Sequence, residues 1–499
     1  METKVFKPSK YQQAVYDFIE KGNGNAVIDA VAGSGKSTTI VTALKLVPKS
    51  KTALFLAFNK AIIKELKEKI GEQSNVEVKT LHSLGCNAVL RHLKLTFNNI
   101  DENKYYTHIN NAMKYDAIKP TYRLEDDDIA DYKSNIVKLT DLGRSYLCSS
   151  VAELEQIAIK HSIVVIDNEC DMAMKTIDWG RNEVGSIDFT DMIYFPNVKK
   201  IPIWQYDYVF IDECQDLNTA QRELFLKCLK PNGRFIAVGD PRQAIYGFAG
   251  ADIESFEKLK NLNNTTLLPL SVCYRCDADI IGMAKSIVPQ IEAKDNAPNG
   301  IVDLEAKLAD IQDSDMVLCR ITAPLVKLCM QYIGQGVKAY VKGRDIGANL
   351  INMIRKTDET TIEKVIIRLN SEAEKIVRKV MRKTHCSDAE ARQTNAFTSY
   401  NDKINAIIVL SEGLNNADSV CNRIETIFKD DQRNGICLST IHKAKGLEAN
   451  NVYIICEEKF YLKHCMKVQW MAEQERNLVY VAYTRAKHKL GFVIDFKCD

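Results

Sequence analysis

Short apolar runs alternate along the chain with longer segments in which apolar residues recur every third or fourth position. The short runs predict buried strands, and the longer segments predict helices that pack against them. In the first half of the chain, strands are expected at 25–29, 52–58, 76–82, 206–212, 234–240 and 265–270. Strands that alternate with helices indicate an α/β fold with a parallel sheet.

A second set of apolar runs predicts a second sheet. Its strands are expected at 315–320, 337–341, 435–442, 451–456 and 489–496. Because a domain usually takes roughly 150 residues, a chain of 499 residues is long enough for two such cores and additional segments. We therefore expect two α/β cores.

Each core is interrupted by a segment without comparable strand patterns. Residues 84–185 are charged, contain tyrosines and have mostly helical spacing. Residues 347–430 also predict helices, because "TTIEKVIIRLNSEAEKIVRKVMRK" (360–383) has apolar positions at helical spacing and "SDAEA" (387–391) is typical of a helix start. Both segments are therefore expected to be helical inserts.

Composition and charge restrict the ligands and the compartment. With 46% hydrophobic and 26% charged residues, the composition is that of an ordinary soluble globular protein. A net charge of +2 provides no global field toward nucleic acid or membrane, so a polyanion has to be bound by a local basic groove. The N-terminus lacks the apolar core of a signal peptide, and no apolar run approaches about eighteen residues. We expect a protein of the cytoplasm or, in a eukaryotic cell, of the nucleus, with no secretion and no membrane partner.

The cysteines agree with that compartment. Fifteen are scattered along the chain, an odd number that fits a reducing compartment better than a disulfide framework. "CYRC" (273–276) is a single C-x-x-C without a second pair nearby, so a zinc site is not expected there.

The stretch "AVAGSGKSTTI" (30–40) follows an apolar run and opens a helical pattern. Gly33 and Gly35 allow a tight turn whose N–H groups converge on phosphate oxygens. Lys36 adds a charge for the outer phosphates, and Ser37 offers a hydroxyl to Mg²⁺. Alanine replaces the first glycine of the usual loop, but the two glycines that approach phosphate remain. We therefore predict a nucleoside triphosphate site formed by Ala30, Val31, Ala32, Gly33, Ser34, Gly35, Lys36, Ser37 and Thr38.

Two carboxylates follow the strand expected at 206–212, in "VFIDECQD" (209–216). Asp212 is expected to hold Mg²⁺ directly or through water, and Glu213 to orient and deprotonate the water that attacks the γ-phosphate. Acidic residues at a strand end can also serve only to keep it solvated. The phosphate loop upstream favours the catalytic interpretation.

A third informative stretch is "AVGDPRQAIYGFAGAD" (237–252). Gln243 could contact the γ-phosphate, and Tyr246 and Phe248 lie close to it in sequence. Aromatic residues at such spacing are commonly core residues. A motor, however, needs a phosphate sensor beside an aromatic group that holds nucleic acid, and this segment supplies both.

These motifs and seven others, in this order, resemble those of the UvrD/Rep-type superfamily 1 DNA helicases. The sequence around "FNKAI" and "TLHSLG" is similar to that of the branch that includes phage helicases and the eukaryotic F-box DNA helicase. Each motif alone is weak or moderate, whereas the ordered series is specific and runs from end to end of the chain. The series is "YQQAV" (11–15), "AVAGSGKST" (30–38), "FNKAI" (58–62), "TLHSLG" (80–85), "IDFTDMI" (187–193), "FIDECQDLNTAQ" (210–221), "VGDPRQAIYGFAGA" (238–251), "CYRC" (273–276), "STIHKAKGLEANNV" (439–452) and "ERNLVYVAYTRAK" (475–487).

The resemblance implies further contacts with ATP. Gln12, or its neighbour Gln13, would read the adenine edge, and Tyr274 would stack on the base. Arg275 and Arg485 would reach the γ-phosphate, and Glu448 would face the nucleotide. Without the context of these motifs, Arg275 and Arg485 would be interpreted as ordinary surface charges.

The resemblance also implies contacts with single-stranded DNA. The expected residues are Phe58, Asn59, His82, Tyr246 and Phe248 from the first core and Thr440, His442 and Lys445 from the second. Stacking of a base on an aromatic ring contributes roughly 1–3 kcal/mol, comparable with the ~1.4 kcal/mol of a duplex stacking step. His82 and His442 could instead be hydrogen-bonded ends of secondary structure.

The chain departs from the family's most common motif sequences at a few positions. Phe248 stands where tryptophan is usual, "DPRQ" replaces a more acidic run, and both inserts are short compared with large bacterial relatives. The short second insert puts in doubt the autoinhibitory and duplex-gripping roles proposed for that subdomain. No nuclease domain is expected after the last motif.

The implied fold is two RecA-like P-loop domains with parallel sheets, each with a helical insert, and ATP in the cleft between them. The expected parts are domain 1A (1–83 and 186–270), insert 1B (84–185), domain 2A (271–346 and 431–499) and insert 2B (347–430). The implied activity is an ATP- and Mg²⁺-dependent 3′-to-5′ DNA helicase in repair, replication or recombination. It would act on single strands and on junctions of single- and double-stranded DNA, alongside replication or repair proteins. A translocase that strips proteins from DNA, an ATP-gated DNA-binding scaffold and an RNA track stay open.

Overall fold

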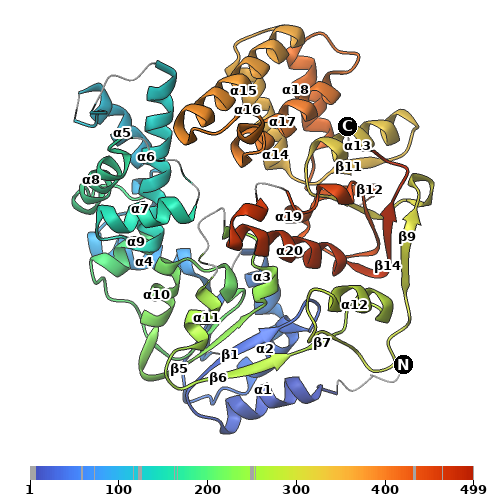
Figure 1. The fold of residues 1–499 in the computed structure, drawn as a ribbon. Helices are drawn as coiled ribbons and strands as arrows, with labels where there is room; N and C mark the ends of the chain where they lie inside the picture. Colours follow the sequence, from blue (N-terminus) through green and yellow to red (C-terminus); the bar gives the residue numbers. More distant parts are fainter. Residues whose placement is uncertain are drawn as a thin grey trace. The chain divides into compact units, whose positions relative to one another are not determined.

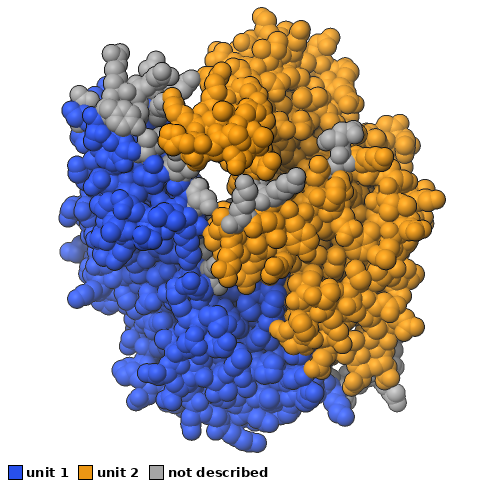
Figure 2. Space-filling model, viewed as in Figure 1, with its two compact units in different colours: residues 1–30, 35–271 blue, residues 31–34, 272–499 orange. Residues whose placement is uncertain are grey.

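The computed structural model of the chain describes residues 7–497, with the exception of 58–59, 72–73, 116, 122–125, 162, 164, 166, 248–251, 253, 431–433 and 463–464. The chain divides into two compact units (Figure 2). Unit 1 comprises residues 1–30 and 35–271, and unit 2 comprises residues 31–34 and 272–499. Each unit contains one of the two expected α/β cores.

Unit 1 is built on the sheet that contains β1, β5 and β6 in Figure 1. This sheet has six strands in the order β3-β2-β4-β5-β1-β6. All neighbouring strands in it run parallel. The strands are β1 (Asn25–Ala30), β2 (Ala53–Ala57), β3 (Val76–Thr80), β4 (Tyr206–Ile211), β5 (Leu229–Gly239) and β6 (Thr265–Leu270). All six coincide with predicted runs, although β5 begins at Leu229 rather than at Arg234.

The helices of unit 1 fall into two groups. The helices next to the sheet are α1 (Lys10–Lys21), α2 (Lys36–Lys45), α3 (Lys60–Ile70), α4 (Leu81–Leu93), α9 (Phe189–Val198), α10 (Thr219–Lys227) and α11 (Ser255–Lys260). The helices of the first insert are α5 (Lys104–Lys114), α6 (Asp126–Tyr146), α7 (Val151–Lys160) and α8 (Glu169–Asn182). Short 3₁₀ turns lie at Phe97–Asn99, Cys214–Asp216 and Pro241–Gln243.

Successive residues of the strands pack on opposite faces of the sheet. On β2, Phe55 belongs to a buried cluster with α1, α2 and α3, whereas Leu54 and Leu56 belong to a cluster with α4, α9, α10 and α11. Because helices cover both faces, an inner strand such as β2 is apolar at every position, as is usual for buried parallel sheets. This double burial is the reason why the strands could be predicted from apolar runs.

The first insert has a hydrophobic core of its own, formed mainly by α5 to α8 with the facing sides of α4 and α9. A buried ionic network joins these helices. The guanidinium of Arg144 on α6 is fully buried and donates to both carboxylate oxygens of Asp188 at 2.8 Å and to Asp191 at 2.9 Å. Lys104 on α5 donates to the other oxygen of Asp191 at 2.9 Å. The network therefore ties α5 and α6 to the start of α9.

Replacing Arg144 by alanine should lower the free energy of unfolding by about 3–5 kcal/mol, because Asp188 and Asp191 would stay buried with one cation fewer. Urea unfolding followed by the fluorescence of Trp179, which stacks on His108 in this region, would measure the change. Arg91 on α4 is exposed, and its replacement by alanine should stay within about 0.5 kcal/mol of the wild type. Equal stability of the two variants would contradict the stabilising role of the network.

Unit 2 contains a second six-stranded parallel sheet with the order β11-β12-β10-β13-β14-β9, and a small two-stranded sheet, β7-β8. The strands are β7 (Val272–Cys273), β8 (Glu292–Ala293), β9 (Ile301–Ala306), β10 (Met316–Cys319), β11 (Ala339–Val341), β12 (Ile436–Thr440), β13 (Ala449–Ile454) and β14 (Ala486–Val493). The five predicted strands are all present. The edge strand β9 was not among them.

Nine helices of unit 2 are described, with 3₁₀ turns at Leu308–Asp310, Glu457–Lys459 and Cys465–Lys467. Around the sheet they are α12 (Ala278–Lys285), α13 (Ala323–Gly334), α19 (Ile441–Ala444) and α20 (Gln469–Tyr483). The second insert contains α14 (Arg344–Lys356), α15 (Ile362–Thr384), α16 (Asp388–Ala391), α17 (Asn395–Ser411) and α18 (Ala417–Ile427). The helices expected at 360–383 and 387–391 correspond to α15 and α16, while the division into four parts stays a prediction.

The second insert shares one hydrophobic core with the sheet of unit 2. Val317 and Leu438 from the strands lie in the same buried cluster as Leu350, Val365 and Ile407 from the insert. This arrangement differs from that of the first insert, whose core is separate from the two clusters of its sheet. The second insert is therefore held to its sheet by continuous apolar packing.

Two further expectations concern cysteines and membranes. Thirteen of the described cysteines are free thiols, most of them buried, whereas Cys456 forms a disulfide. Among the described residues, no group of His, Cys, Asp and Glu side chains has the arrangement of a metal site. This finding applies to Cys273 and Cys276 as well. Within the described part of the chain, no helix has the length and apolarity that a bilayer span requires.

Candidate nucleotide site and nucleic-acid surface

The predicted phosphate loop connects β1 to α2. Gly33 and Gly35 have φ values of +66° and +76°, in the left-handed region that favours glycine. A Cβ on Gly33 would also lie 2.7 Å from Cβ of Arg275 and 2.8 Å from Sγ of Cys273, which belong to unit 2 as Gly33 does. The loop conformation therefore requires glycine for two reasons at position 33.

The loop presents donors at the start of α2. The first intrahelical bond runs from Thr39 N to Gly35 O, so the preceding N–H groups are available to an anion. Ser37 and Thr38 are exposed in this first turn. The hydroxyl of Ser34 is buried and has no hydrogen-bond partner among the described residues. These features fit a phosphate group.

Lys36 meets the two predicted carboxylates at the end of β4. Its Nζ donates to Glu213 Oε1 at 2.7 Å, and Asp212 Oδ1 accepts from the N–H of Glu213 at 2.9 Å. Burial lowers the pKa of Lys36, but the carboxylates of Glu213 and Asp212 outweigh it and raise that pKa overall. Burial, and next the neighbouring Glu213, raise the pKa of Asp212. A buried carboxylate of this kind is stabilised in its charged form by a nearby cation.

A hydrogen-bonded chain leads from Glu213 to Gln243. Gln215 donates to Glu213 Oε2 at 2.6 Å and accepts from the N–H of Asp240 at 3.1 Å. Asp240 in turn accepts from Nε2 of Gln243 at 2.8 Å. A Cβ on Gly239 would lie 2.4 Å from Oε1 of Gln215 and 2.8 Å from Sγ of Cys214, so a larger residue here would displace Gln215 from this chain. The predicted phosphate sensor is thus connected to the predicted general base.

The structure distinguishes the two glutamines near the N-terminus. Gln12 is buried, donates to Thr39 Oγ1 on α2 at 3.1 Å and accepts from the N–H of Ser9 at 3.0 Å. Gln13 is exposed and pairs with Asp17 on the same helix. Of the two, Gln12 is therefore the one held against the helix that follows the loop, while its contact with adenine stays a prediction.

The two predicted arginines lie in unit 2 together with Glu448. Arg275 donates from Nε to Glu448 at 2.7 Å and from Nη1 to the carbonyl of Thr484 at 3.1 Å. Arg485 is fully buried, and its described acceptors are the carbonyls of Val481 and Leu447 and the hydroxyl of Thr484.

Arg485 carries a buried charge without a carboxylate hydrogen-bonded to it among the described residues. Burial, and next the charge of Arg275, lower its pKa to about 10, so it is still a cation at neutral pH. Burying a charge without an anionic partner is costly. The surroundings of Arg485 therefore fit an anionic ligand. Tyr274, predicted to stack on the base, is partly exposed and donates its N–H to the carbonyl of Gly33 at 2.8 Å.

The predicted DNA contacts are placed only in part. Phe58, Asn59 and Phe248 lie outside the described residues. In unit 1, His82 is exposed in the first turn of α4, and Tyr246 is half-buried after the turn that carries Gln243.

In unit 2, Thr440 and His442 line a pocket of about 960 Å³, and Lys445 follows at the end of α19. The hydroxyl of Thr440 caps α19 by accepting from the N–H of Lys443. Burial lowers the pKa of His442, so its imidazole is neutral at physiological pH. His442 can therefore take part in hydrogen bonds but does not add a positive charge.

Several residues of the site were not singled out from the sequence, although they stand inside the quoted motifs. Gln215 and Asp240 complete the chain of hydrogen bonds, and Thr39 holds Gln12. Tyr480 accepts the N–H of Ala32 through its hydroxyl at 2.8 Å. Their partners are distant in sequence, so motif spacing alone gives no signal for these contacts.

The two parallel sheets and the phosphate loop define a protein with two RecA-like α/β units. Residues 11–264 match the model of the UvrD/REP helicase N-terminal domain, and residues 435–493 match that of the UvrD-like helicase C-terminal domain. The first match covers just over half of the chain. The chain therefore belongs to the UvrD/Rep helicase family.

Individual relatives agree with this assignment. F-box DNA helicase protein 1 of Schizosaccharomyces pombe is 22% identical over 501 residues, which cover 93% of this chain and 55% of that protein. ATP-dependent DNA helicase Rep of Buchnera aphidicola is 27% identical over 54% of this chain and 44% of the relative. ATP-dependent DNA helicase PcrA of Bacillus subtilis is 24% identical over 54% of this chain and 38% of the relative. The chain thus spans about half or less of the length of these curated relatives.

Proposed function

We propose that this protein is an ATP-dependent DNA helicase that moves along single-stranded DNA. The observation that carries the proposal is the pairing of Lys36 with Glu213 beside the buried Asp212 at the end of β4. A lysine for the outer phosphates, a carboxylate for the metal ion and a second carboxylate for the attacking water are the groups that hydrolysis of a triphosphate needs.

Each side chain then has a defined task. The γ-phosphate would draw Lys36 away from Glu213, which frees that carboxylate to orient and deprotonate water. Mg²⁺ would be held by Ser37 and Asp212, since hydroxyl and carboxylate oxygens are ligands that it prefers. When bound, this ion would supply charge neutralisation at the phosphates.

The remaining residues would read the state of the nucleotide. Gln243 would sense the terminal phosphate through the chain that links it to Glu213, and Tyr246 follows three residues later. Arg275 and Arg485 would neutralise charge that develops on the transferred phosphoryl group. Release of that group would change the affinity for DNA, which is the coupling that a motor requires.

The polarity is proposed to be 3′ to 5′, on the basis of the resemblance to UvrD/Rep-type helicases. The test is ATP hydrolysis with and without single-stranded DNA, together with strand displacement on duplexes that carry a 3′ or a 5′ tail. We expect hydrolysis to be stimulated by DNA, to weaken as salt rises because phosphate contacts release counterions, and unwinding to need the 3′ tail.

Other outcomes would change the proposal in defined ways. Stimulated hydrolysis without strand displacement would indicate a translocase that removes proteins from DNA. DNA binding with negligible turnover would indicate an ATP-gated scaffold. Unwinding from a 5′ tail alone would contradict the proposed polarity.

A further inference from the structure

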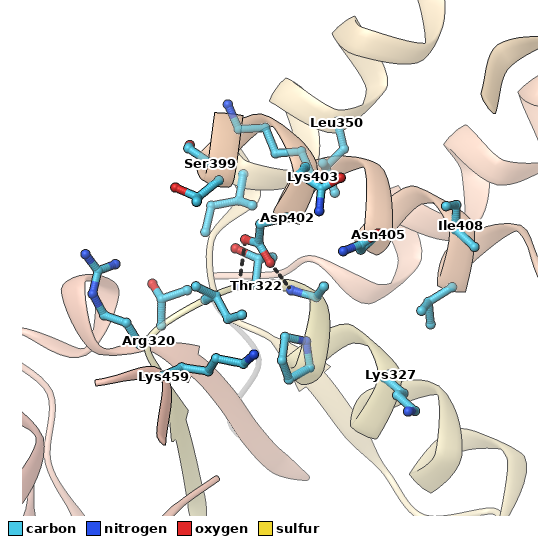
Figure 3. A pocket seen from close by; sticks show the side chains of 18 of the residues that line it. Arg320, Thr322, Lys327, Leu350, Ser399, Asp402, Lys403, Asn405, Ile408 and Lys459 are labelled. Atoms are coloured by element: carbon cyan, nitrogen blue, oxygen red, sulfur yellow. Dashed lines mark hydrogen bonds between the residues drawn. The ribbon is translucent and has the colours of Figure 1, made fainter. Parts of the chain in front are cut away.

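The pocket that contains Thr440 and His442 has a second wall, which the sequence motifs do not include. The ends of β10 and β12 and the start of α13 form one side, and α17 of the second insert forms another (Figure 3). Lys459, in the 3₁₀ turn after β13, also lines it. All lining residues belong to unit 2.

The wall formed by α17 is fixed to the sheet. Asp402 on α17 accepts from the N–H groups of Thr322 and Ala323, each at 2.9 Å, and so caps the start of α13 (Figure 3). Burial raises the pKa of this carboxyl, although both N–H groups act in the opposite direction. On the other face of α17, Ile404 and Ile407 lie in the core that the insert shares with the sheet. The pocket wall is therefore held by both hydrogen bonds and apolar packing.

The pocket has more cations than the acids around it neutralise. The side-chain amino groups of Lys403 on α17, Lys459 and Lys497 have no ion-pair or hydrogen-bond partner among the described residues. The acidic lining residues are Asp402, which faces backbone N–H groups, and the exposed Glu412. Of the other lining cations, Arg320 pairs with Glu475, Arg392 with Glu374 and Asp388, and Lys443 with Asp345, while Lys327 lies over the ring of Phe496.

The lining also has apolar surface beside these charges. Ile321, Phe397 and Leu462 contribute to it, and Phe397 is partly exposed. Surfaces that bind single-stranded nucleic acid typically combine two features. Positively charged side chains lie along the phosphate backbone, and apolar or aromatic groups beside them contact the bases. The volume of about 960 Å³ also exceeds what one phosphate ion needs.

We propose that the second insert is part of the track for single-stranded DNA, with Lys403 and Lys459 bound to successive backbone phosphates in this pocket. The inference rests on the proposed function and extends it to an element outside the ordered motifs. The insert then acts as a fixed wall of the track, because Asp402 and the shared core hold α17 against α13 and the sheet.

The test is the double variant Lys403→Ala/Lys459→Ala, with binding of fluorescent oligo(dT) measured by anisotropy at several salt concentrations. Each lost contact to a charged phosphate should weaken binding by about tenfold. The slope of log affinity against log salt should become shallower by about 0.7 for each lost contact. Lys364→Ala is the matched control, since Lys364 lies on α15 of the same insert, is exposed and does not line the pocket.

Affinity within twofold of the wild type and an unchanged salt slope in a folded double variant would overturn the inference. So would a loss confined to duplex DNA. Affinity of the intact full-length protein for a fluorescent ATP analogue should be the same in all variants, because neither lysine is in the phosphate loop. If the wild type binds that analogue but no oligonucleotide, the proposed function fails together with the inference. If the wild type binds both, and the double variant binds oligo(dT) as tightly as the Lys364→Ala control, the inference alone fails.

Discussion

Replacing Lys36 by alanine should reduce DNA-stimulated ATP hydrolysis by at least about 10²–10³-fold, the usual effect of removing one group that stabilises developing charge. In the structure, Lys36 Nζ lies 2.7 Å from Glu213, and the surrounding carboxylates raise its pKa, so it is a cation at every pH at which the enzyme would be assayed. Alanine would remove the charge for the outer phosphates. Steady-state release of inorganic phosphate, with Mg²⁺ present, measures the effect.

The matched control is Lys45→Ala. Lys45 lies at the other end of the same helix, away from the phosphate loop, and is exposed. Its replacement should leave hydrolysis and the thermal midpoint unchanged. Full activity of a folded Lys36→Ala variant would refute the assignment of the phosphate loop, and chelation of Mg²⁺ in the wild type should reproduce the low rate of that variant.

Replacing Arg485 by lysine should lower kcat by about 10²–10³-fold while the affinity for ATP changes little. Arginine presents a planar fork of donors, whereas lysine offers a single compact charge, so the charge alone does not replace it. Arg485 is buried with only neutral hydrogen-bond acceptors among the described residues, which leaves its charge available to an anionic ligand. Single-turnover hydrolysis, with binding of a fluorescent ATP analogue measured separately, distinguishes the two effects.

Lysine rather than alanine is chosen here because it keeps a cation in the buried position and disturbs the fold less. Arg476→Lys serves as the control, since Arg476 is on α20 shortly before Arg485 and is exposed. That variant should hydrolyse ATP at the wild-type rate. A folded Arg485→Lys variant with wild-type kcat would contradict the role of Arg485, whereas a lower melting temperature would show a role in stability instead.

The strands that lie inside each sheet could be predicted because both of their faces are covered. β2 is apolar at every position, since alternate residues enter two different clusters. The edge strand β9 reads "IVDLEA", and most of its residues are exposed or half-buried, so it gives no apolar run. The early start of β5 was missed for another reason, since Pro231 and Gly233 are typical of turns.

The candidate site was predictable where its residues are contiguous. Lys36, Asp212 and Glu213 each follow or precede a strand in a recognisable motif, and the structure brings Lys36 and Glu213 into contact. The contacts of Gln215 and Tyr480 could not be inferred, because each joins segments that meet only in the folded chain. The pocket beside α17 depends in the same way on the packing of the insert.

The shared core of unit 2 affects how this protein could be re-engineered. The first insert surrounds its own apolar centre, so it resembles a cassette that could be exchanged or shortened with limited damage to the neighbouring sheet. The second insert contributes Leu350, Val365 and Ile407 to the interior of the sheet layer itself. Cutting it out would leave Val317 and Leu438 open to water, and such a truncated chain would aggregate rather than yield a smaller folded protein.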